Sequence, residues 1–221
     1  MSISRQVPVI NWKNGGLQRR DDEVATEVPV ALTYNKRSHV VMMVTPTALE
    51  DFAIGFSLTE GIIGQPSDIL EVSVIERENG LEAAMTVNGD CFERLADQRR
   101  NLVGRTGCGL CGAESLDQAI RNPSVVGSDL SVTADALQTA ILSLNAHQPL
   151  QVVTGAVHGA AWCKTDGEIL VLREDVGRHN ALDKLIGFLF RTGFDPADGF
   201  VLVSSRASYE MVYKAASAGI E

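Results

Sequence analysis

The order of predicted elements in the second half of the chain is the feature that most restricts its fold. Residues 200–204 are apolar until Ser204, as in a strand buried on both faces of a sheet. Residues 156–163 and 168–173 form a hairpin, and two helices are predicted over residues 180–191 and 208–218. The order strand, strand, helix, strand, helix predicts an α/β fold with a mixed sheet covered by helices.

A further helix is expected before this unit, over residues 134–146, beginning at Thr133 or Asp135. Its apolar residues recur at helical spacing, so we expect one face to point inward, made of Leu137, Ala140, Ile141 and Leu144.

The first half is predicted to be rich in β-strands. Residues 28–34 and 39–44 read as one hairpin, and residues 69–75 and 81–87 as a second across Asn79-Gly80. Between them, Thr45 and Pro46 are typical of a helix start, and Gly61 of a helix end.

Three regions follow from this pattern. Residues 1–24 are predicted to be a loose polar N-terminal arm, and residues 25–107 a β-rich N-terminal domain that ends in a polar, basic linker over 90–107. Residues 108–221 are predicted to be the α/β domain.

A pair of cysteines, Cys108 and Cys111, lies in a loop with glycine before, between and after them. Thiols at this spacing can close a disulfide, hold a metal or carry a sulfur atom, and the bare loop gives a partner access. A short helix predicted over 113–121 would favour a thiolate there. The plain alternative is a pair of inert, half-buried thiols.

Composition and charge argue against several classes of function. The formal net charge of −9 argues against a broad nucleic-acid surface. No apolar run approaches the roughly 18 residues of a membrane span, and the first residues have no secretory apolar core, so no membrane partner and a cytoplasmic location are expected. One close cysteine pair, without the His-x-Glu of zinc deaminases, leaves too few ligands for zinc, so no metal is expected.

Polar residues cluster where three predicted strands begin or end, around residues 154–159, 173–180 and 204–208. Helix-terminal amides, hydroxyls and arginines suit an anionic ligand, and ligands gather at the ends of strands in helix-covered sheets. The candidate ligand-binding residues are His158, Arg178, His179, Ser205, Arg206 and Ser208. Each also has a structural alternative: Asp175 could cap the following helix, Arg178 could pair with an acidic neighbour, and the histidines could be ordinary core residues.

Several motifs closely resemble the formate dehydrogenase accessory sulfurtransferase family (FdhD/NarQ). The resemblance begins near residue 25 and rests on residues 27–32, 52–63, 107–112, 173–187 and 206–212. The block over 173–187, Arg-Glu-Asp-Val-Gly-Arg-His-Asn-Ala-Leu-Asp-Lys-Leu-Ile-Gly, is long enough to be specific by itself.

The resemblance implies a cytidine deaminase-like α/β domain and a sulfurtransferase activity. The protein would accept persulfide sulfur from a cysteine desulfurase on Cys108, with Cys111 assisting. It would pass the sulfur to the molybdenum cofactor, bis-(molybdopterin guanine dinucleotide), for formate dehydrogenase. That cofactor would bind transiently, with no permanently bound cofactor. The alternative is a cofactor carrier or chaperone without sulfur transfer.

The chain departs from the family pattern at two positions, where Ala156 and Ser205 stand in place of the usual glycines. Family members normally continue with a further strand and helix, so a C-terminally truncated chain is expected. A homodimer is possible, and the sequence does not identify the partner desulfurase or dehydrogenase.

Overall fold

The computed structural model describes residues 1–100, 125–127 and 130–221. The strands are β1 Ser4–Lys13, β2 Gly16–Ala25, β3 Val28–Tyr34, β4 Arg37–Val44, β5 Ile69–Arg77, β6 Gly80–Val87, β7 His158–Lys164, β8 Ile169–Asp175 and β9 Gly199–Val203. The α-helices are α1 Leu49–Thr59, α2 Gly89–Arg100, α4 Ala134–Leu144, α5 Pro149–Thr154, α6 Arg178–Thr192 and α7 Tyr209–Ser217. The predicted cysteine loop and the helix over 113–121 lie outside the described residues.

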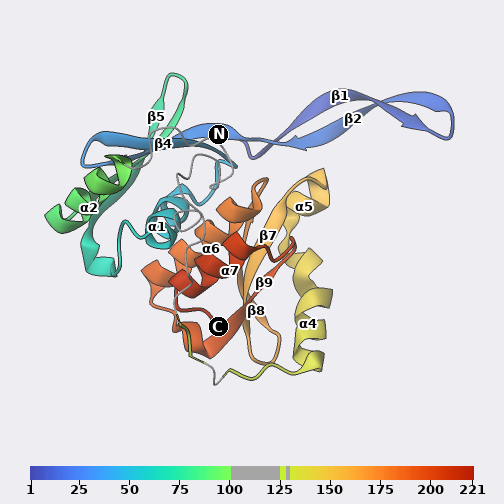
Figure 1. The fold of residues 1–221 in the computed structure, drawn as a ribbon. Helices are drawn as coiled ribbons and strands as arrows, with labels where there is room; N and C mark the ends of the chain where they lie inside the picture. Colours follow the sequence, from blue (N-terminus) through green and yellow to red (C-terminus); the bar gives the residue numbers. More distant parts are fainter. Residues whose placement is uncertain (101–124, 128–129) are drawn as a thin grey trace.

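The body of the molecule is built in layers (Figure 1). A four-stranded sheet, in the order β4-β3-β6-β5, packs on α1, and α1 packs on α6. Helix α6 in turn covers one face of a three-stranded sheet, in the order β8-β7-β9, and α4 lies on the other face of that sheet. The α/β architecture of helix-covered sheets is therefore confirmed.

The two N-terminal hairpins have the predicted turns. Asn35 and Lys36 both take positive φ between β3 and β4, as a tight hairpin turn requires. Strands β5 and β6 pair in antiparallel fashion from Ile69 opposite Val87 to Arg77 opposite Gly80. Parallel pairing of β3 with β6 joins the two hairpins into one mixed sheet.

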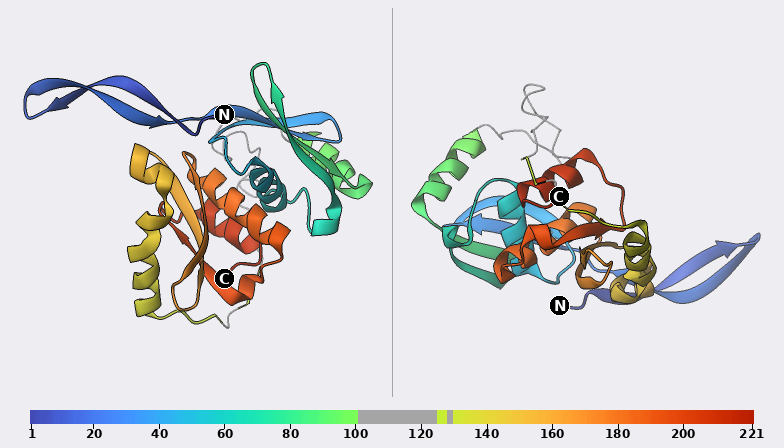
Figure 2. Two further views of the ribbon diagram at one scale, coloured as in Figure 1. Left: turned by 180° about the vertical axis from the view of Figure 1, so that it is seen from behind. Right: turned by 90° about the horizontal axis from the view of Figure 1, so that it is seen from below.

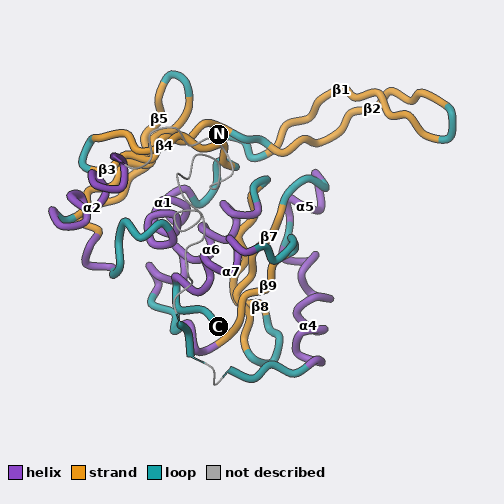
Figure 3. The backbone as a smooth tube through the Cα atoms, in the orientation of Figure 1, coloured by secondary structure: helices purple, strands orange, loops and turns teal. Residues whose placement is uncertain are grey.

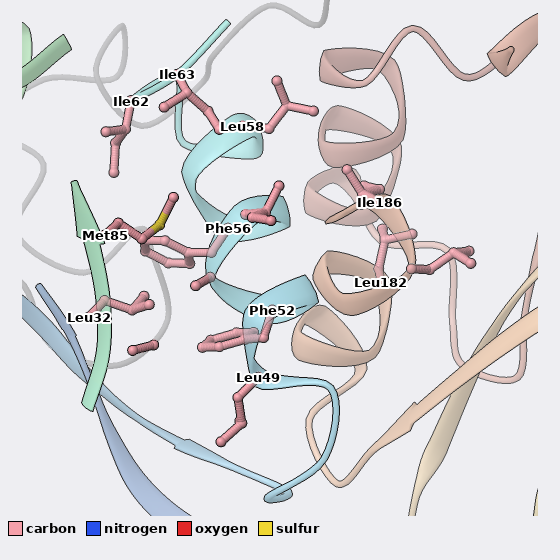
Figure 4. Packing of buried hydrophobic residues seen from close by; sticks show 14 of the residues in the cluster. Leu32, Leu49, Phe52, Phe56, Leu58, Ile62, Ile63, Met85, Leu182 and Ile186 are labelled. Carbon is pink, nitrogen blue, oxygen red and sulfur yellow. The ribbon is translucent and has the colours of Figure 1, made fainter. Parts of the chain in front are cut away.

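Helix α1 is the centre of the hydrophobic core and is buried on nearly every side. Its aromatic residues Phe52 and Phe56 face the first sheet, next to Leu32 and Met85, and Leu182 and Ile186 approach from α6 (Figure 4). A helix that is apolar almost all round is stable only between two other layers.

Two glycines allow α1 and α6 to cross at close range. A Cβ at Gly55 would come within 1.8 Å of the Asp183 carbonyl oxygen, and a Cβ at Gly187 within 1.8 Å of the Asp51 carbonyl oxygen. Next to the crossing, the Asp51 carboxylate accepts hydrogen bonds from Arg173 of β8 and Arg191 of α6. Backbone contact and a charged clamp thus fix the two helices to each other.

Three expectations about the first half need correction. The residues 1–24, expected to be a loose arm, are mostly paired in the antiparallel hairpin β1–β2, because alternating side chains and the Asn14-Gly15 turn favour strands. The first part of the expected linker forms α2. Helix α1 begins at Leu49 after Ala48, so Thr45 does not cap it.

Two expectations about the second half also differ from the structure. Over the described residues the second sheet is antiparallel, since β7 pairs antiparallel with both β8 and β9; the parallel pair lies in the first sheet. Helix α4 forms with Thr133 as its N-cap, and Ala140 and Leu144 pack against the second sheet as predicted. Leu137 and Ile141, however, are exposed, and Ala136 is buried instead. The small residues face inward because they allow the helix to approach the strands closely.

Candidate functional site

The cysteine pair Cys108 and Cys111, named from the sequence, lies outside the described residues. The other two cysteines are free thiols in the interior. Burial raises the pKa of Cys163 to about 11. Burial also raises the pKa of Cys91, although Arg94, whose guanidinium lies 3.0 Å from the sulfur, acts in the opposite direction. Neither described cysteine is therefore suited to react as a thiolate near neutral pH.

The structure brings the three polar clusters together at one edge of the second sheet. Because β7 runs antiparallel to β8 and β9, its first residues lie beside the last residues of the other two strands. His158 is paired with Asp175 across β7 and β8, and the Gly159 N–H donates to Ser204 Oγ at 2.9 Å. The predicted grouping of these segments is confirmed.

Most of the polar residues in the block over 173–180 have structural partners. The Glu174 carboxylate accepts hydrogen bonds from the backbone N–H groups of Leu150 and Gln151, and so caps the start of α5. Asp175 accepts from the Thr45 N–H at 2.9 Å and from the Gly177 N–H at 2.8 Å. Asp175 therefore holds the turn before α6, but it does not cap the helix as the structural alternative expected, because the N-cap is Gly177 and no side chain caps the first turn.

The Asp175 carboxylate also pairs with Lys184 at 2.8 Å, and both side chains are fully buried. Lys184 Nζ donates in addition to the Thr45 carbonyl oxygen at 2.9 Å. The ion pair therefore joins α6 and the end of β8 to the segment that leads into α1, which is far from both in the sequence.

Replacing Lys184 by methionine is expected to destabilise the protein by about 3–5 kcal/mol, because it leaves the buried Asp175 carboxylate without its cation. Urea unfolding followed by circular dichroism would measure the loss. Lys164→Met is the matched control, since Lys164 forms an exposed pair with Glu168, and it should leave the free energy of unfolding nearly unchanged. Equal unfolding midpoints for the Lys184 variant and the unmodified chain would contradict this role.

Unlike Glu174 and Asp175, Arg178 and Ser208 each have a side-chain atom that is not engaged in a structural contact within the described part of the chain. Arg178 Nε and Ser208 Oγ are buried polar atoms without a hydrogen-bond partner among the described residues. Gly177 and Ser208 precede α6 and α7, and in neither case does a side chain cap the first turn. Uncapped helix N-termini with unsatisfied donors are a favourable environment for an anion.

A contact between α6 and α7 places these two N-termini next to each other. His179 Nε2 lies 2.8 Å from Glu210 Oε2, which is in the first turn of α7. Burial lowers the pKa of His179, and the neighbouring Glu210 opposes this shift. Sequence reasoning missed Glu210 as the partner of His179, although an acidic residue in the first turn of a predicted helix was a visible signal.

The remaining predicted site residues lie near the N-termini of α6 and α7, at the same edge of the second sheet. Arg206 is exposed and Ser205 is half-buried, and Ser205 Oγ donates to the Arg206 carbonyl oxygen at 3.3 Å. His158 is half-buried at the start of β7. Together with Arg178, His179 and Ser208 they form what we call the strand-end site, which places two arginines and two serines around two free helix N-termini.

Other parts of the described structure are weaker candidates for a functional site. A cavity of about 430 Å³ lies beside Cys91 and is lined by two acidic residues, Asp68 and Asp90. The Asp68 carboxylate already accepts hydrogen bonds from the N–H groups of Gly64 and Gln65, and the bond from Gly64 lowers the pKa of Asp68 most. No group of three potential metal ligands occurs in the ranges described. None of the helices in the described part of the chain is both long and apolar enough to cross a membrane.

Comparison with known proteins adds an independent finding. Residues 25–221 match the model of the FdhD/NarQ family. A protein of Cupriavidus necator named sulfur carrier protein FdhD is 54% identical over 211 residues, which make up 96% of this chain and 73% of the relative. A protein of the same name from Bordetella petrii is 47% identical over 205 residues, or 93% of this chain and 74% of the relative.

The fold is shared with a solved structure as well. The crystal structure of a protein described as a formate dehydrogenase accessory protein, from Desulfotalea psychrophila, matches with a TM-score of 0.73 and 25% identity. The match covers 99% of this chain and 81% of the other.

Proposed function

The chain belongs to the FdhD/NarQ family, and from that premise we propose that it is a sulfurtransferase that carries persulfide sulfur on Cys108. It would accept sulfur from a cysteine desulfurase and pass it to a guanine-dinucleotide molybdenum cofactor for formate dehydrogenase. The observation that carries the proposal is the 54% identity to a sulfur carrier protein over nearly the whole chain.

The chemistry of the thiols supports Cys108 and Cys111 as the reactive pair. The described cysteines, Cys91 and Cys163, are buried and their pKa values are raised. The other two lie between glycines in the sequence. In the proposed step the Cys108 thiolate attacks the outer sulfur of the desulfurase persulfide, and the desulfurase cysteine leaves as a thiolate. One sulfur–sulfur bond forms as another breaks, so the step needs no added oxidant. A reducing cytoplasm would keep these thiols available.

The strand-end site is proposed to hold the cofactor through its phosphate groups. Arg178 and Arg206 supply charge, the first turns of α6 and α7 supply free N–H groups, and Ser208 supplies a buried hydroxyl without a partner among the described residues. Ser205, His158 and His179 lie around the same point and would add hydrogen bonds. Cargo bound there would lie at the edge of the second sheet.

Mass spectrometry of the unmodified chain after incubation with a cysteine desulfurase and cysteine tests the proposal. The protein should gain about 32 Da, one sulfur atom, and the gain should be removed by a reductant, as expected of a persulfide. Omission of the desulfurase is the control. A chain that binds guanosine diphosphate but never gains sulfur would instead be a cofactor carrier without transfer activity.

Arg206→Ala is expected to weaken the binding of guanosine diphosphate about ten- to a hundredfold, because it removes a charge-assisted hydrogen bond to phosphate. Isothermal titration would measure the change, with circular dichroism to show that the fold is retained. Arg77→Ala is the matched control, since Arg77 is an exposed arginine at the end of β5 and pairs with Glu82. Equal affinities for the two variants would place the phosphate site elsewhere.

A further inference from the structure

Helices α6 and α7 lie side by side next to the second sheet (Figure 3; orange and red in Figure 2). Two charged contacts, one helical turn apart, join them, because residues four positions apart lie on the same face of a helix. In the first contact, His179 Nε2 of α6 lies 2.8 Å from Glu210 Oε2 of α7. In the second, Lys214 Nζ of α7 lies 3.0 Å from Asp183 Oδ2 of α6. Together they fix how the two helices lie against each other.

The two contacts differ in their exposure to a ligand. Lys214 and Asp183 lie in the interior, where Lys214 Nζ also donates to Thr59 Oγ1 at 2.8 Å. The His179 and Glu210 side chains, in contrast, are each 31% exposed. Both belong to the first turns of their helices, which border the strand-end site. A charge on either side chain therefore acts on a ligand at the two helix N-termini.

The Glu210 carboxylate has the wrong charge for the phosphate groups proposed to bind at this site. The arginines and the free N–H groups attract an anion, whereas a carboxylate in the first turn of α7 repels it. His179 can remove this repulsion, since imidazole changes its charge near neutral pH and guanidinium does not. With His179 protonated the pair carries no net charge, and with His179 neutral the pair carries one negative charge.

The groups that face His179 determine when its charge changes. Burial lowers the pKa of His179 most, Glu210 opposes this shift, and Arg178 and Lys214 add to it. Because the net shift is downward from 6.5, the imidazole is mostly neutral at neutral pH in the free protein. A bound phosphate places negative charge beside the imidazole, which raises the pKa of His179. Anion binding and protonation of His179 therefore favour each other.

We propose that His179 and Glu210 form a proton-coupled gate on the strand-end site. Protonated His179 neutralises Glu210 and admits a phosphate group, and neutral His179 leaves the Glu210 carboxylate to repel it. Binding of the anion takes up a proton on His179, and release of the anion returns that proton to water. The gate rests on the proposed phosphate site, to which it adds a control of affinity by pH.

The test is the affinity of the full chain for guanosine diphosphate mannose, measured by isothermal titration from about pH 5 to about pH 8. The diphosphate of this probe is a diester, so the probe itself does not titrate in that range. The affinity of the unmodified chain should fall about tenfold as the pH rises. His147→Gln is the matched control, because His147 is exposed and its Nδ1 contacts the Ser143 carbonyl oxygen, outside the strand-end site. It should leave the pH dependence unchanged.

Substitutions of the two gate residues should have opposite effects. His179→Gln should weaken binding about tenfold at pH 5 and remove the pH dependence, because the Glu210 carboxylate stays uncompensated. Glu210→Gln should strengthen binding about tenfold at pH 8, because the repelling charge is gone. Loss of a merely structural contact would instead weaken binding in both variants. Glu50→Gln is the control for the second change, since Glu50 is exposed in the first turn of α1, and it should leave the affinity unchanged.

Arg206→Ala separates a failure of the gate from a failure of the phosphate site. If the unmodified chain does not bind the probe, or binds it equally well without the Arg206 side chain, the phosphate site lies elsewhere and the gate is overturned with it. If Arg206→Ala weakens binding but the affinity of the unmodified chain does not change with pH, the gate alone is overturned. The same holds if Glu210→Gln weakens binding.

Discussion

A Cys108→Ala protein incubated with a cysteine desulfurase and cysteine is expected to gain no sulfur, whereas the unmodified chain gains about 32 Da. Transfer requires a thiolate that can reach the desulfurase persulfide, and alanine removes the sulfur atom that we propose forms the new bond. The loss should be complete rather than partial. Intact-mass spectrometry with a persulfide-specific probe measures it.

The matched controls are the other cysteines. Cys91→Ala and Cys163→Ala should still gain sulfur, because both thiols are buried and burial raises the pKa of each. Cys111→Ala divides the roles of the pair, since an assisting thiol can be removed without preventing the first transfer. Labelled sulfur on the Cys108→Ala protein would show that another cysteine is the acceptor.

Gly187→Ala is expected to prevent normal folding, with a loss of more than about 4 kcal/mol, which is a large share of the total stability of a typical domain. The added Cβ would lie 1.8 Å from the Asp51 carbonyl oxygen and 2.7 Å from the Gly55 nitrogen. Both are backbone atoms, so no side chain can rotate to make room, and α1 and α6 would have to separate. Soluble yield and urea unfolding would measure the effect.

Gly89→Ala is the control for this substitution. A Cβ at Gly89 has nothing within 4 Å, and its backbone does not take positive φ. Its free energy of unfolding should therefore change by less than about 1 kcal/mol. If Gly187→Ala unfolds at the same urea concentration as the Gly89 variant, the helix crossing tolerates a methyl group and the close approach is not essential.

The patterns that depend on neighbouring residues were predicted well. Alternation and turn residues located the hairpins β3–β4 and β5–β6, and an N-cap threonine and a terminal glycine located helix ends, because these signals act within a few residues of each other. The same kind of signal in β1–β2 was missed. The segments of the strand-end site were also grouped correctly, although the start of β7 lies beside the ends of β8 and β9 only because both pairings are antiparallel.

The sequence did not show which of those polar residues are free to bind a ligand. Glu174, Asp175, Arg178 and His179 look equivalent within one short block, yet the first two are occupied by α5, Thr45 and Lys184. The contact between Asp175 and Thr45 spans 130 positions, so only the packed structure could separate the structural residues from the available ones.

By itself, the sequence determined the family, many of the element types and the candidate thiols, because motif and periodicity are local properties of the chain; it missed the β1–β2 hairpin and α2. The tertiary structure decided which face of each element has a neighbour. Helical spacing predicted that Leu137 and Ile141 face inward beside Ala140, but they are exposed, and Ala136 is buried with Ala140 instead. The tertiary structure also showed why residues 55 and 187 are glycine, since a close crossing of α1 and α6 depends on two segments that meet only after folding.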